Sequence, residues 1–474
     1  MQLLNINERL NKWLGGLRGF SKLYLVGGTV RDLLLEKVPA DIDLACRGAK
    51  ILAERLADLH NAALVAMEKK PHQSCYRVVN REDSTDYLDI AELRSDTIEE
   101  DLLQRDFTIN AMAIELDKNG PCGLVIDPLG GAADLRRKII RMANPQAFDD
   151  DPLRVLRAFR FAGERGFAVE AVTLAAVDSS FVLLARVSAE RIMAELFLLL
   201  KAAQSSRHVA ALDSHRILDV IFPEIMPMKG CLQNGYHHKD VWGHSLLVLE
   251  HIEHILNNPR DYFGETAGAV TQNLEAGDRL PLLKCAALFH DIGKPATKGL
   301  KQAAGRITFR GHDRAGAEIV DLIAERMKLS KQARTLIVLL VREHLQPLFL
   351  SGSDVTSSAR MRWFRKIGAD VVPAIVLSMA DVMSSRGPES GEAYRDNFTS
   401  WCGQMVSDYY SSVKKILERP RLISGHDLIA LGMEPGPELG AILEQVLEAQ
   451  DNGSVTSRDE SLVLARKLMA RMKE

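Results

Sequence analysis

The chain lacks most of the features that mark secreted, membrane-spanning or strongly basic proteins. Its 6 cysteines include no Cys-x-x-Cys pair, which argues against a disulfide framework or a thiolate zinc site and favours a reducing compartment. The first residues, Met1 to Phe20, carry charges throughout and contain no apolar core of a signal peptide. No run approaches the ~18 uninterrupted apolar residues of a membrane span. These absences predict a soluble, cytoplasmic protein with no membrane partner, and the sequence identifies no protein partner.

The chain also lacks an excess of charge of either sign. Lys and Arg number 60 and Asp and Glu 63, so the net charge is −3, and any basic surface for nucleic acid has to be local. Hydrophobic residues make up 46% and charged residues 26%, as in ordinary globular proteins. The length of 474 residues predicts about three domains at ~150 residues per domain.

The pattern of apolar residues changes near residue 145. Before it, short strand-like runs alternate with helical stretches; after it, nearly all segments have helical periodicity. We therefore expect an α/β head followed by an all-α body, and a mostly helical protein overall. The predicted strands are Lys22–Val26, Asp41–Ala45 and Tyr87–Leu93, and the predicted helices include Thr29–Leu35, Pro152–Glu164, 189–203, 242–256 and 438–449.

Polar segments that contain proline or glycine are the best candidates for linkers. They are Pro223–Asn234, Asn257–Asp278 and Ser384–Glu392. Together with the change in periodicity they predict four parts. These are a head (1–145), a helical neck (146–225), a third domain (226–400) and a C-terminal helical tail (401–474).

The segment from Leu25 to Leu44 is the most informative in the head. Gly27 and Gly28 end a predicted strand and open a helix, where backbone amides can approach a phosphate. Asp41 and Asp43 are two residues apart, so on a strand they point to the same face and repel each other unless a cation lies between them. Such oxygen ligands suit Mg²⁺. Taken alone, each motif is more often an ordinary turn or a solvated charged strand.

Five motifs in order make the chain resemble the bacterial tRNA nucleotidyltransferase/poly(A) polymerase family, the class II CCA-adding type with a polymerase-β-like head. The resemblance covers roughly residues 20–200. Its motifs are GGTVRDLLLEKVPADIDL (27–44), RDFTINA (105–111), DPLGGAADL (127–135), DDPLR (150–154) and SAERI (188–192).

The resemblance implies a role for individual residues. Asp41 and Asp43 would bind catalytic Mg²⁺, and Asp89 is our candidate for a third carboxylate, with an edge-strand surface charge as its alternative. The residues implied in nucleotide binding are Gly27, Gly28, Arg31, Arg105, Asp106, Asn110, Asp151 and Arg154. A carboxylate and a guanidinium one helical turn apart, Asp151 and Arg154, can also satisfy the pairing edge of a base, although an N-cap with a same-face ion pair is the alternative.

The sequence departs from the family pattern in three places. Gln104 stands where a second Arg is usual, and Asp150 where Glu is usual. Only ten residues, 95–104, separate Arg94 from Arg105. Full CCA-adding relatives have a longer stretch here, with a flexible loop that helps the pocket change from CTP to ATP. The shortening therefore resembles CC-adding enzymes, and both CC-only and full CCA addition remain open.

A local excess of basic residues lies between 136 and 165. Arg154, Arg157 and Arg160 recur at three-residue spacing on one predicted helix. This stripe predicts that Arg157 and Arg160 follow an RNA backbone, and internal ion pairs on a solvated face are the alternative.

The body contains a second candidate metal site. Histidine and aspartate occur in the order H…HD…H…H…D, which resembles the HD phosphohydrolase superfamily. The six residues are His244, His290, Asp291, His312, His344 and Asp381. Imidazoles with carboxylates suit a divalent transition metal or Mg²⁺, and a bound water would attack a phosphoester. His237, His238 and His251 lie near the motif and would either support the ligands or remain on the surface.

The combined reading is a template-independent nucleotidyltransferase that joins CTP, and ATP if the full CCA is made, to the 3′ end of tRNA. A poly(A) polymerase of the same family and an HD phosphohydrolase with an RNA-binding head are the alternatives. Residues 423–437 resemble the tail module of bacterial members, for which docking of tRNA and packing against the body are both open.

Overall fold

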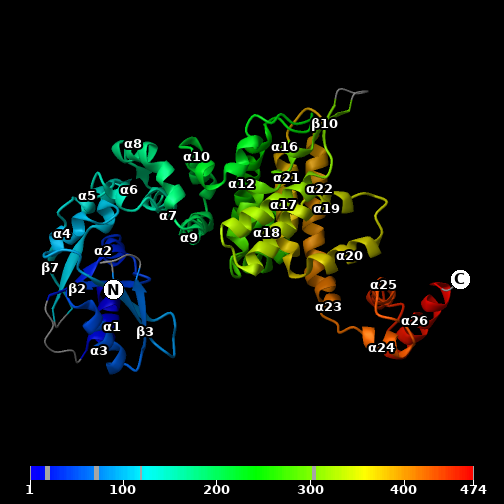
Figure 1. Cartoon of the computed structure of the whole chain (residues 1–474), viewed down its shortest axis with the longest axis horizontal. Coiled ribbons are helices and arrows are strands. Elements are labelled where there is room, and N and C mark those ends of the chain that lie inside the picture. The colour runs from blue at the N-terminus through cyan, green and yellow to red at the C-terminus, as the bar shows by residue number, and fades with distance from the viewer. Residues whose placement is uncertain (1, 16–21, 69–73, 118–119, 302–305, 473–474) are drawn as a thin grey trace. The chain divides into compact units, whose positions relative to one another are not determined.

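The computed structural model describes residues 2–15, 22–68, 74–117, 120–301 and 306–472. The chain forms two compact units, Met1–Ile221 and Phe222–Glu474, which are described separately (Figure 1). Their boundary lies close to the predicted boundary at 225/226. The further division into head, neck, third domain and tail stays a prediction within these two units.

A seven-stranded mixed sheet organises the first unit. Its strand order is β3-β4-β5-β2-β1-β6-β7, with β2 and β5 parallel and the other neighbours antiparallel. The strands are β1 (Leu23–Val26), β2 (Ile42–Cys46), β3 (Ala63–Glu68), β4 (Ser74–Val79), β5 (Tyr87–Glu92), β6 (Ala113–Asp117) and β7 (Gly120–Ile126).

The three strands predicted from the sequence are the centre of this sheet. All four residues of β1 are buried, because both faces of the sheet are covered, as expected for an uninterrupted apolar run. On one face, Ile98 and Leu102 pack with Tyr24, Val26 and Ala45. The outer strands β3, β4, β6 and β7 were not predicted, since their residues alternate weakly between polar and apolar.

Helices surround the sheet and continue into the second half of the unit. The predicted helices 29–35, 152–164 and 189–203 are present as α2, α7 and α9, with ends that agree to within two residues. The helices are α1 (Gln2–Leu14), α2 (Gly27–Leu34), α3 (Ala49–Leu59), α4 (Ile98–Leu103), the 3₁₀ turn η1 (Thr108–Asn110), α5 (Gly131–Arg137), α6 (Ala147–Asp150), α7 (Arg154–Arg165), α8 (Ala171–Ser180), the 3₁₀ helix η2 (Phe181–Arg186), α9 (Ala189–Lys201), α10 (Ser205–Ser214) and α11 (Ile217–Ile221). Two short strands pair in parallel: β8 (Ile139–Ile140), which follows α5, and β9 (Ala168–Val169), which follows α7.

The second unit is almost entirely helical, as predicted. Its central helices α12, α15, α18 and α21 pack against one another. Its elements up to α19 are η3 (Pro223–Met228), α12 (Val241–Asn257), α13 (Pro259–Phe263), η4 (Gly264–Thr266), α14 (Ala267–Glu275), α15 (Arg279–Phe289), α16 (Lys294–Thr297), β10 (Lys298–Lys301), β11 (Arg306–Phe309), α17 (His312–Arg326), α18 (Lys331–Glu343) and α19 (Gln346–Leu350).

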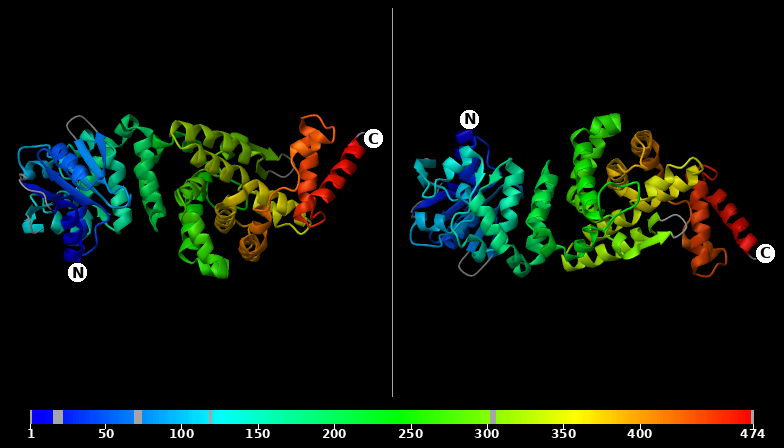
Figure 2. Two further views of the ribbon diagram at one scale, coloured as in Figure 1. Left: turned by 90° about the horizontal axis from the view of Figure 1, so that it is seen from below. Right: turned by 90° about the horizontal axis from the view of Figure 1, so that it is seen from above.

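The remaining helices include α21, whose residues are mostly apolar. They are α20 (Ser357–Ile367), η5 (Gly368–Asp370), α21 (Val371–Ser384), α22 (Glu392–Asp408), the π-helical turn η6 (Tyr409–Val413), α23 (Lys414–Leu417), α24 (Gly425–Ala430), α25 (Pro437–Asp451) and α26 (Arg458–Met472). In two views α24, α25 and α26 lie side by side, and Leu428, Ile442 and Ala465 bury a small core between them (Figure 2).

Two predictions about the body are wrong. Asn257–Asp278 is not a linker, because its helices α13 and α14 bury Phe263, Val270 and Leu274. The β10–β11 hairpin was also missed, since lysine and arginine conceal its alternation. By contrast, residues 385–391 lie outside helices and strands, as the linker prediction for Ser384–Glu392 required.

The helical stretch Ser357–Ser384 is long and apolar enough to cross a membrane by length and composition. Its most apolar window is 72% buried inside the protein, as in the core helix of a globular unit. Burial by protein, rather than by lipid, therefore explains its composition.

Candidate active sites

The Gly27–Gly28 turn lies directly against the carboxylate of Asp43. Gly27 has a φ of 63°, a left-handed conformation that glycine adopts without strain. A Cβ atom on Gly28 would lie 3.3 Å from Asp43 Oδ2. Thr29, which the sequence reading did not single out, ties the two segments together. Its hydroxyl donates to Asp41 O (3.1 Å) and accepts from Asp43 N (2.7 Å).

The three predicted carboxylates lie in one region. Asp43 pairs in register with Asp89 across the parallel strands β2 and β5, and Asp41 comes one residue before β2. Burial and the neighbouring charges of Asp89 and Asp41 raise the pKa of Asp43 to about 6. The alternative that Asp89 is a surface charge on an edge strand is wrong, because β5 lies between β4 and β2 in the sheet. The region thus combines oxygen donors with an excess of negative charge that a divalent cation would offset.

Two further residues hold these carboxylates, and neither was predicted. Arg77 on β4 donates to both oxygens of Asp89, each at 2.7 Å. Its guanidinium lies over the ring of Tyr87, 3.9 Å from the centroid. The Tyr87 hydroxyl donates to Asp41. The cross-strand pairing that joins these residues is invisible in a single sequence, where Arg77 and Tyr87 are ordinary strand residues.

Arg31, Asn110 and Asp106, expected to hold the nucleotide, form one chain of hydrogen bonds. Arg31 Nη1 donates to Asn110 Oδ1 (2.6 Å), and Asn110 Nδ2 donates to Asp106 Oδ1 (3.1 Å). All three side chains are buried. Burial acts to raise the pKa of Asp106, but the charges of Arg157 and Arg154 together with the hydrogen bonds from Arg157 and Asn110 outweigh it and hold that pKa well below its ordinary value. This chain of three hydrogen-bonded side chains is therefore in place before any ligand binds.

Arg105 and Arg154 lie near the same region but are held by other partners. Arg105 forms an ion pair with Asp101 of α4 (3.1 Å), and a Cβ atom on Gly27 would lie 3.1 Å from Arg105 Nη1. Arg154 donates to the carbonyl oxygens of Ala147 (3.2 Å) and Gln104 (3.0 Å). The structure thus places Arg105 at the glycine turn and Arg154 against the backbone beside α4.

Asp151 lies just before α7 and pairs with an arginine that is distant in the sequence. Its Oδ1 accepts from Leu153 N (3.3 Å), and its Oδ2 accepts from Arg191 Nη2 (2.7 Å). The alternative of an N-cap with a same-face ion pair is not observed, because Leu153 is the N-cap of α7 and Asp151 pairs with Arg191 rather than with Arg154. Recognition of a base by Asp151 and Arg154 stays a prediction.

Arg157 and Arg160 point into an ion-pair network around Glu195. Arg157 contacts Asp106 (2.6 Å) and Glu195 (3.1 Å), and Arg160 contacts Glu195 (2.5 Å) and Glu164 (2.8 Å). Both guanidinium groups also lie over the ring of Phe161. These are the contacts expected of internal ion pairs, the alternative to an RNA-binding stripe. RNA binding by these two arginines stays a prediction that their contacts do not favour.

The six predicted ligands of the body converge on one buried centre. His244 Nε2 lies 2.8 Å from Asp381 Oδ1, and His312 Nε2 lies 3.3 Å from Asp291 Oδ1. His290 and His344 lie between these pairs, 3.2 and 3.8 Å from the Asp291 carboxylate. Two groups of candidate ligands come from the motif, namely His244, His290 and Asp291, and Asp291, His312 and His344. Asp291 therefore belongs to two groups and stands between two candidate ion positions.

Backbone carbonyls orient three of the histidines. The Nδ1 atoms of His290, His312 and His344 lie 2.9, 2.7 and 2.7 Å from the carbonyl oxygens of Ala287, Phe309 and Val341. A carbonyl only accepts, so each Nδ1 carries the hydrogen and each Nε2 keeps its lone pair for a cation. Burial lowers the pKa of His344 to about 4, so its imidazole is neutral near pH 7.

The polar atoms of the centre also fit a metal. Within the described residues, His290 Nε2 and Asp291 Oδ2 are buried and make no hydrogen bond of good geometry. Lys294 Nζ nevertheless lies 2.5 Å from Asp291 Oδ2 as an ion-pair partner. Burial acts to raise the pKa of Asp291, but its positively charged surroundings, the Lys294 ammonium among them, hold that pKa well below its ordinary value. Two buried potential ligand atoms that lack a hydrogen bond of good geometry are what a site for a cation leaves when only protein atoms are present.

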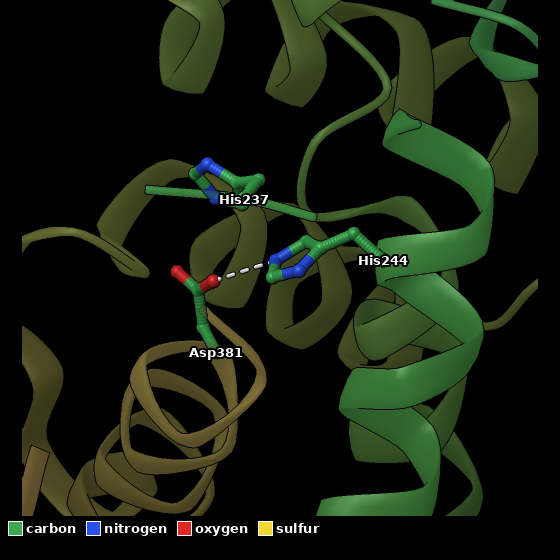
Figure 3. Close-up of side chains that lie close together, drawn as sticks. All are labelled: His237, His244 and Asp381. Atoms are coloured by element: carbon green, nitrogen blue, oxygen red, sulfur yellow. Dashed lines mark hydrogen bonds and ion pairs between the residues drawn. The ribbon is translucent and has the colours of Figure 1, made fainter. Parts of the chain in front are cut away.

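His237 belongs to the same centre, although it precedes the six-residue motif. Its ring lies close to His244 and Asp381, which come from helices α12 and α21 (Figure 3). Burial and the charge of Lys294 lower the pKa of His237 to about 3. His251, in contrast, bonds to Ser384 (3.0 Å) and Arg386 (2.9 Å) and is not among the candidate ligands.

Family models match three consecutive parts of the chain. The poly A polymerase head domain matches residues 23–141, and the probable RNA- and SrmB-binding site of polymerase A matches 166–229. The HD domain matches residues 241–385. Asp41, Asp43 and Asp89 thus fall in the first match. The six residues of the histidine centre's motif fall in the third match, whereas His237 lies outside it.

Two relatives match nearly the whole chain. The A-adding tRNA nucleotidyltransferase of Deinococcus radiodurans is 31% identical and covers 92% of this chain and 93% of its own length. The CC-adding tRNA nucleotidyltransferase of Thermus thermophilus is 30% identical and covers 92% of this chain and 91% of its own length. The multifunctional CCA protein of Herminiimonas arsenicoxydans is 33% identical but covers only 68% of this chain.

Solved structures share the fold at lower identity. An apo form of a CCA-adding enzyme superposes with a TM-score of 0.62 and 23% identity, covering 98% of this chain and 94% of that chain. The Thermotoga maritima CCA-adding enzyme complexed with tRNA has a TM-score of 0.57 and 23% identity, covering 99% and 95%. The expected architecture, a nucleotidyltransferase-type head before a helical body, is confirmed.

Proposed function

Because the chain belongs to the tRNA nucleotidyltransferase/poly(A) polymerase family, we propose that it is an enzyme that adds nucleotides from CTP or ATP to the 3′ end of tRNA. The reaction needs no nucleic-acid template and releases pyrophosphate. One observation carries the proposal: the carboxylates of Asp41, Asp43 and Asp89 gather beside the glycine turn that opens α2. A triphosphate at the turn would lie next to metal-binding oxygens.

The residues of the head divide the work of binding and positioning. Asp41 and Asp43, with Asp89 beside them, would hold Mg²⁺, which when bound offsets phosphate charge and supports attack by the tRNA hydroxyl. Gly27 and Gly28 leave space for phosphates, since a side chain at either position would approach Arg105 or Asp43. The remaining nucleotide-binding residues are proposed as Arg31, Arg105, Asp106, Asn110, Asp151 and Arg154.

We further propose that the enzyme adds only part of the CCA sequence. The short connection 95–104 is not a flexible loop, because Ile98–Leu103 form helix α4 and bury Ile98 and Leu102 in the core of the head. Asp101 of this helix accepts hydrogen bonds from Arg94 N (3.0 Å) and Arg105 (3.1 Å). A segment held by a core and by ion pairs has little freedom to reshape the pocket from CTP to ATP.

Three tRNA substrates test this proposal. Transcripts that end before CCA, after C and after CC are incubated separately with CTP and with ATP. Growth by two nucleotides with CTP alone supports CC addition, and ATP added only to the CC end supports A addition. Completion of CCA from both nucleotides contradicts restricted addition, and long A tracts on unrelated RNA favour a poly(A) polymerase. An Asp41→Ala variant has to be inactive in every case, or the head serves another purpose.

We propose that the HD centre is a second, metal-dependent phosphohydrolase site. Its donor set of imidazole nitrogens and carboxylates suits a transition metal such as Mn²⁺, or Mg²⁺, which when bound supplies an activated water. Lys294 lies 2.5 Å from Asp291 and 2.6 Å from Gln233, so it can meet the charge of a phosphate oxygen at the same place. A damaged RNA end with a 2′,3′-cyclic phosphate is the substrate class that connects both centres.

A comparison of wild type and His290→Ala tests the second site. The wild type should hydrolyse a 2′,3′-cyclic nucleotide with Mn²⁺, and the variant should not, while both add nucleotides to tRNA at the same rate. Equal hydrolysis by both proteins would exclude this centre from the reaction. The expected location of the protein, the cytoplasm, agrees with a tRNA substrate and stays a prediction.

A further inference from the structure

His237 stands outside the six-residue HD motif, in the loop before α12, yet its ring faces the metal centre. The potential ligand atoms of His237, His244 and Asp381 all lie within 4.8 Å of one another (Figure 3). The His237 and His244 rings meet edge to face, with centroids 4.7 Å apart. Among the described residues, this is a third group of side chains able to hold a metal ion in the centre, and it shares two ligands with the proposed site.

The loop before α12 that carries His237 forms backbone hydrogen bonds with the segment that follows α21. Tyr236 O accepts from Gly387 N (2.7 Å), and Gly235 O accepts from Glu389 N (2.9 Å). A Cβ atom on Gly387 would lie 2.3 Å from Gly235 O, so only glycine permits this close approach. The loop is therefore held against the segment that follows α21.

The hydrogen bonds of the His237 ring leave one nitrogen directed to a cation. Nδ1 lies 3.1 Å from the side-chain oxygen of Asn234, which accepts only, so Nδ1 carries the hydrogen. The other nitrogen, Nε2, has only a long contact of 3.4 Å with the Ser385 hydroxyl. That hydroxyl also donates to Asp381 O at 3.2 Å. Since a serine has one hydroxyl hydrogen, the lone pair of Nε2 remains available.

We infer that His237 is an additional ligand, through Nε2, of the ion held by His244 and Asp381. The inference rests on the proposed metal centre and goes beyond its six-residue motif. With this ligand, the two ion positions differ. The ion held by His244 and Asp381 has a further ligand from a loop that is bonded to the segment after α21. The other ion has His312 and His344, from α17 and the end of α18.

Metal binding by full-length variants tests this inference without any activity measurement. Protein stripped with EDTA is titrated with Mn²⁺, and free Mn²⁺ is followed by electron paramagnetic resonance. All proteins in this titration carry Asp43→Asn, so that the proposed ions of the head do not contribute, and we expect His237→Ala to weaken one of the two binding steps of the HD centre by about tenfold or more. His344→Ala should weaken the other step, and the exposed neighbour variant His238→Ala should leave both unchanged.

A second variant and a spectrum separate a ligand from a packing residue. His237→Phe keeps the ring contact with His244 but has no nitrogen, so it should bind Mn²⁺ as weakly as His237→Ala. Loaded with Co²⁺, both variants should show altered visible absorption bands, because these bands report the ligands of the ion. Wild-type binding and spectra in both variants would overturn the inference and leave the centre intact. Failure of the wild type to bind Mn²⁺ or Co²⁺ would instead overturn the centre itself.

Discussion

Arg77 and Asp89 form a two-bond ion pair, with 2.7 Å from Arg77 Nε to Asp89 Oδ1 and 2.7 Å from Arg77 Nη2 to Asp89 Oδ2. Asp89 is in turn the register partner of Asp43. One row of charged residues therefore crosses β4, β5 and β2 and ends at the glycine turn. The arginine offsets one of the three carboxylates, so fewer negative charges remain for metal ions to balance.

Removing the arginine should weaken both the geometry and the charge balance of this row. We expect Arg77→Met to raise the Mg²⁺ concentration needed for half-maximal CTP incorporation severalfold, because Asp89 loses the partner that orients it. Stability should fall by only about 1–2 kcal/mol, since a third of the Arg77 side chain is exposed. Arg81→Met, an exposed position after the same strand, is the matched control. Equal Mg²⁺ dependence in both variants would contradict a positioning role for Arg77.

The raised pKa of Asp43 predicts that its charge destabilises the metal-free fold. A folded pKa of about 6 against an ordinary value of 3.8 means that the native state binds the proton more tightly than the unfolded chain. Stability is therefore lost as the pH rises from about 4 through 6, by up to ~3 kcal/mol above that range. We expect Asp43→Asn to be inactive but more stable than wild type at pH 8 in EDTA.

Calorimetry of the first unit's transition at two pH values checks this expectation. The gain in stability of Asp43→Asn at pH 8 should nearly vanish at pH 4, where wild-type Asp43 is protonated. Saturating Mg²⁺ should also reduce the gain, because the ion offsets the charge in wild type. A variant that melts below wild type at pH 8 would show that the carboxylate stabilises the fold.

The network around Glu195 predicts a structural cost for Arg157. Arg157→Met would leave the carboxylates of Asp106 and Glu195 without their shared partner in a buried region. We expect a loss of about 3–5 kcal/mol of stability, measured by chemical unfolding, with lower affinity for CTP, because Asp106 also anchors Asn110 and Arg31. Arg136→Met, an exposed arginine on α5, should change stability by less than about 0.5 kcal/mol. Similar losses in both variants would contradict the network.

The salt dependence of tRNA binding should change when exposed basic residues are replaced and not when a buried one is replaced. Arg136 and Arg137 are exposed on α5, whereas Arg160 is only 9% exposed and paired with glutamates. We expect Arg136→Ala and Arg137→Ala each to reduce the slope of log K for tRNA binding against log salt by about 0.7–0.9, and Arg160→Gln to leave it unchanged. An altered slope for Arg160→Gln would restore the prediction of an RNA-binding stripe.

Metal removal should lower the stability of the second unit. At a Mn²⁺ concentration 100 times its dissociation constant, binding adds about 2.7 kcal/mol, which EDTA should abolish. Asp291→Asn should lose this increment, because Asp291 belongs to both ligand groups of the motif. Glu318→Gln, an exposed change on α17, should keep it. Equal melting of wild type with Mn²⁺ and with EDTA would argue against a metal-binding centre.

Several features followed from residue order alone. The change from strand to helix periodicity near residue 145, the glycine turn before two aspartates and the H…HD…H…H…D order each depend on spacing along one chain. Local rules govern such features, since residues two apart share a strand face and glycine permits a left-handed turn. In the buried centre, His244 and His290 lie 2.8 and 3.8 Å from the Asp381 carboxylate, so residues that the motif only orders along the chain lie together in space.

Partners chosen across strands and helices were decided only by the tertiary structure. Arg157 and Arg160 have the spacing of an exposed stripe, but packing of α7 against α9 directs them to Glu195 instead. Arg77 meets Asp89 through strand pairing, and His237 meets Asp381 because the glycine at 387 lets two loops touch. The sequence by itself determined which side chains have the chemistry predicted for metal and phosphate binding. Packing decided which charges they balance, because a side chain's partner depends on distances between segments that spacing along the chain does not contain.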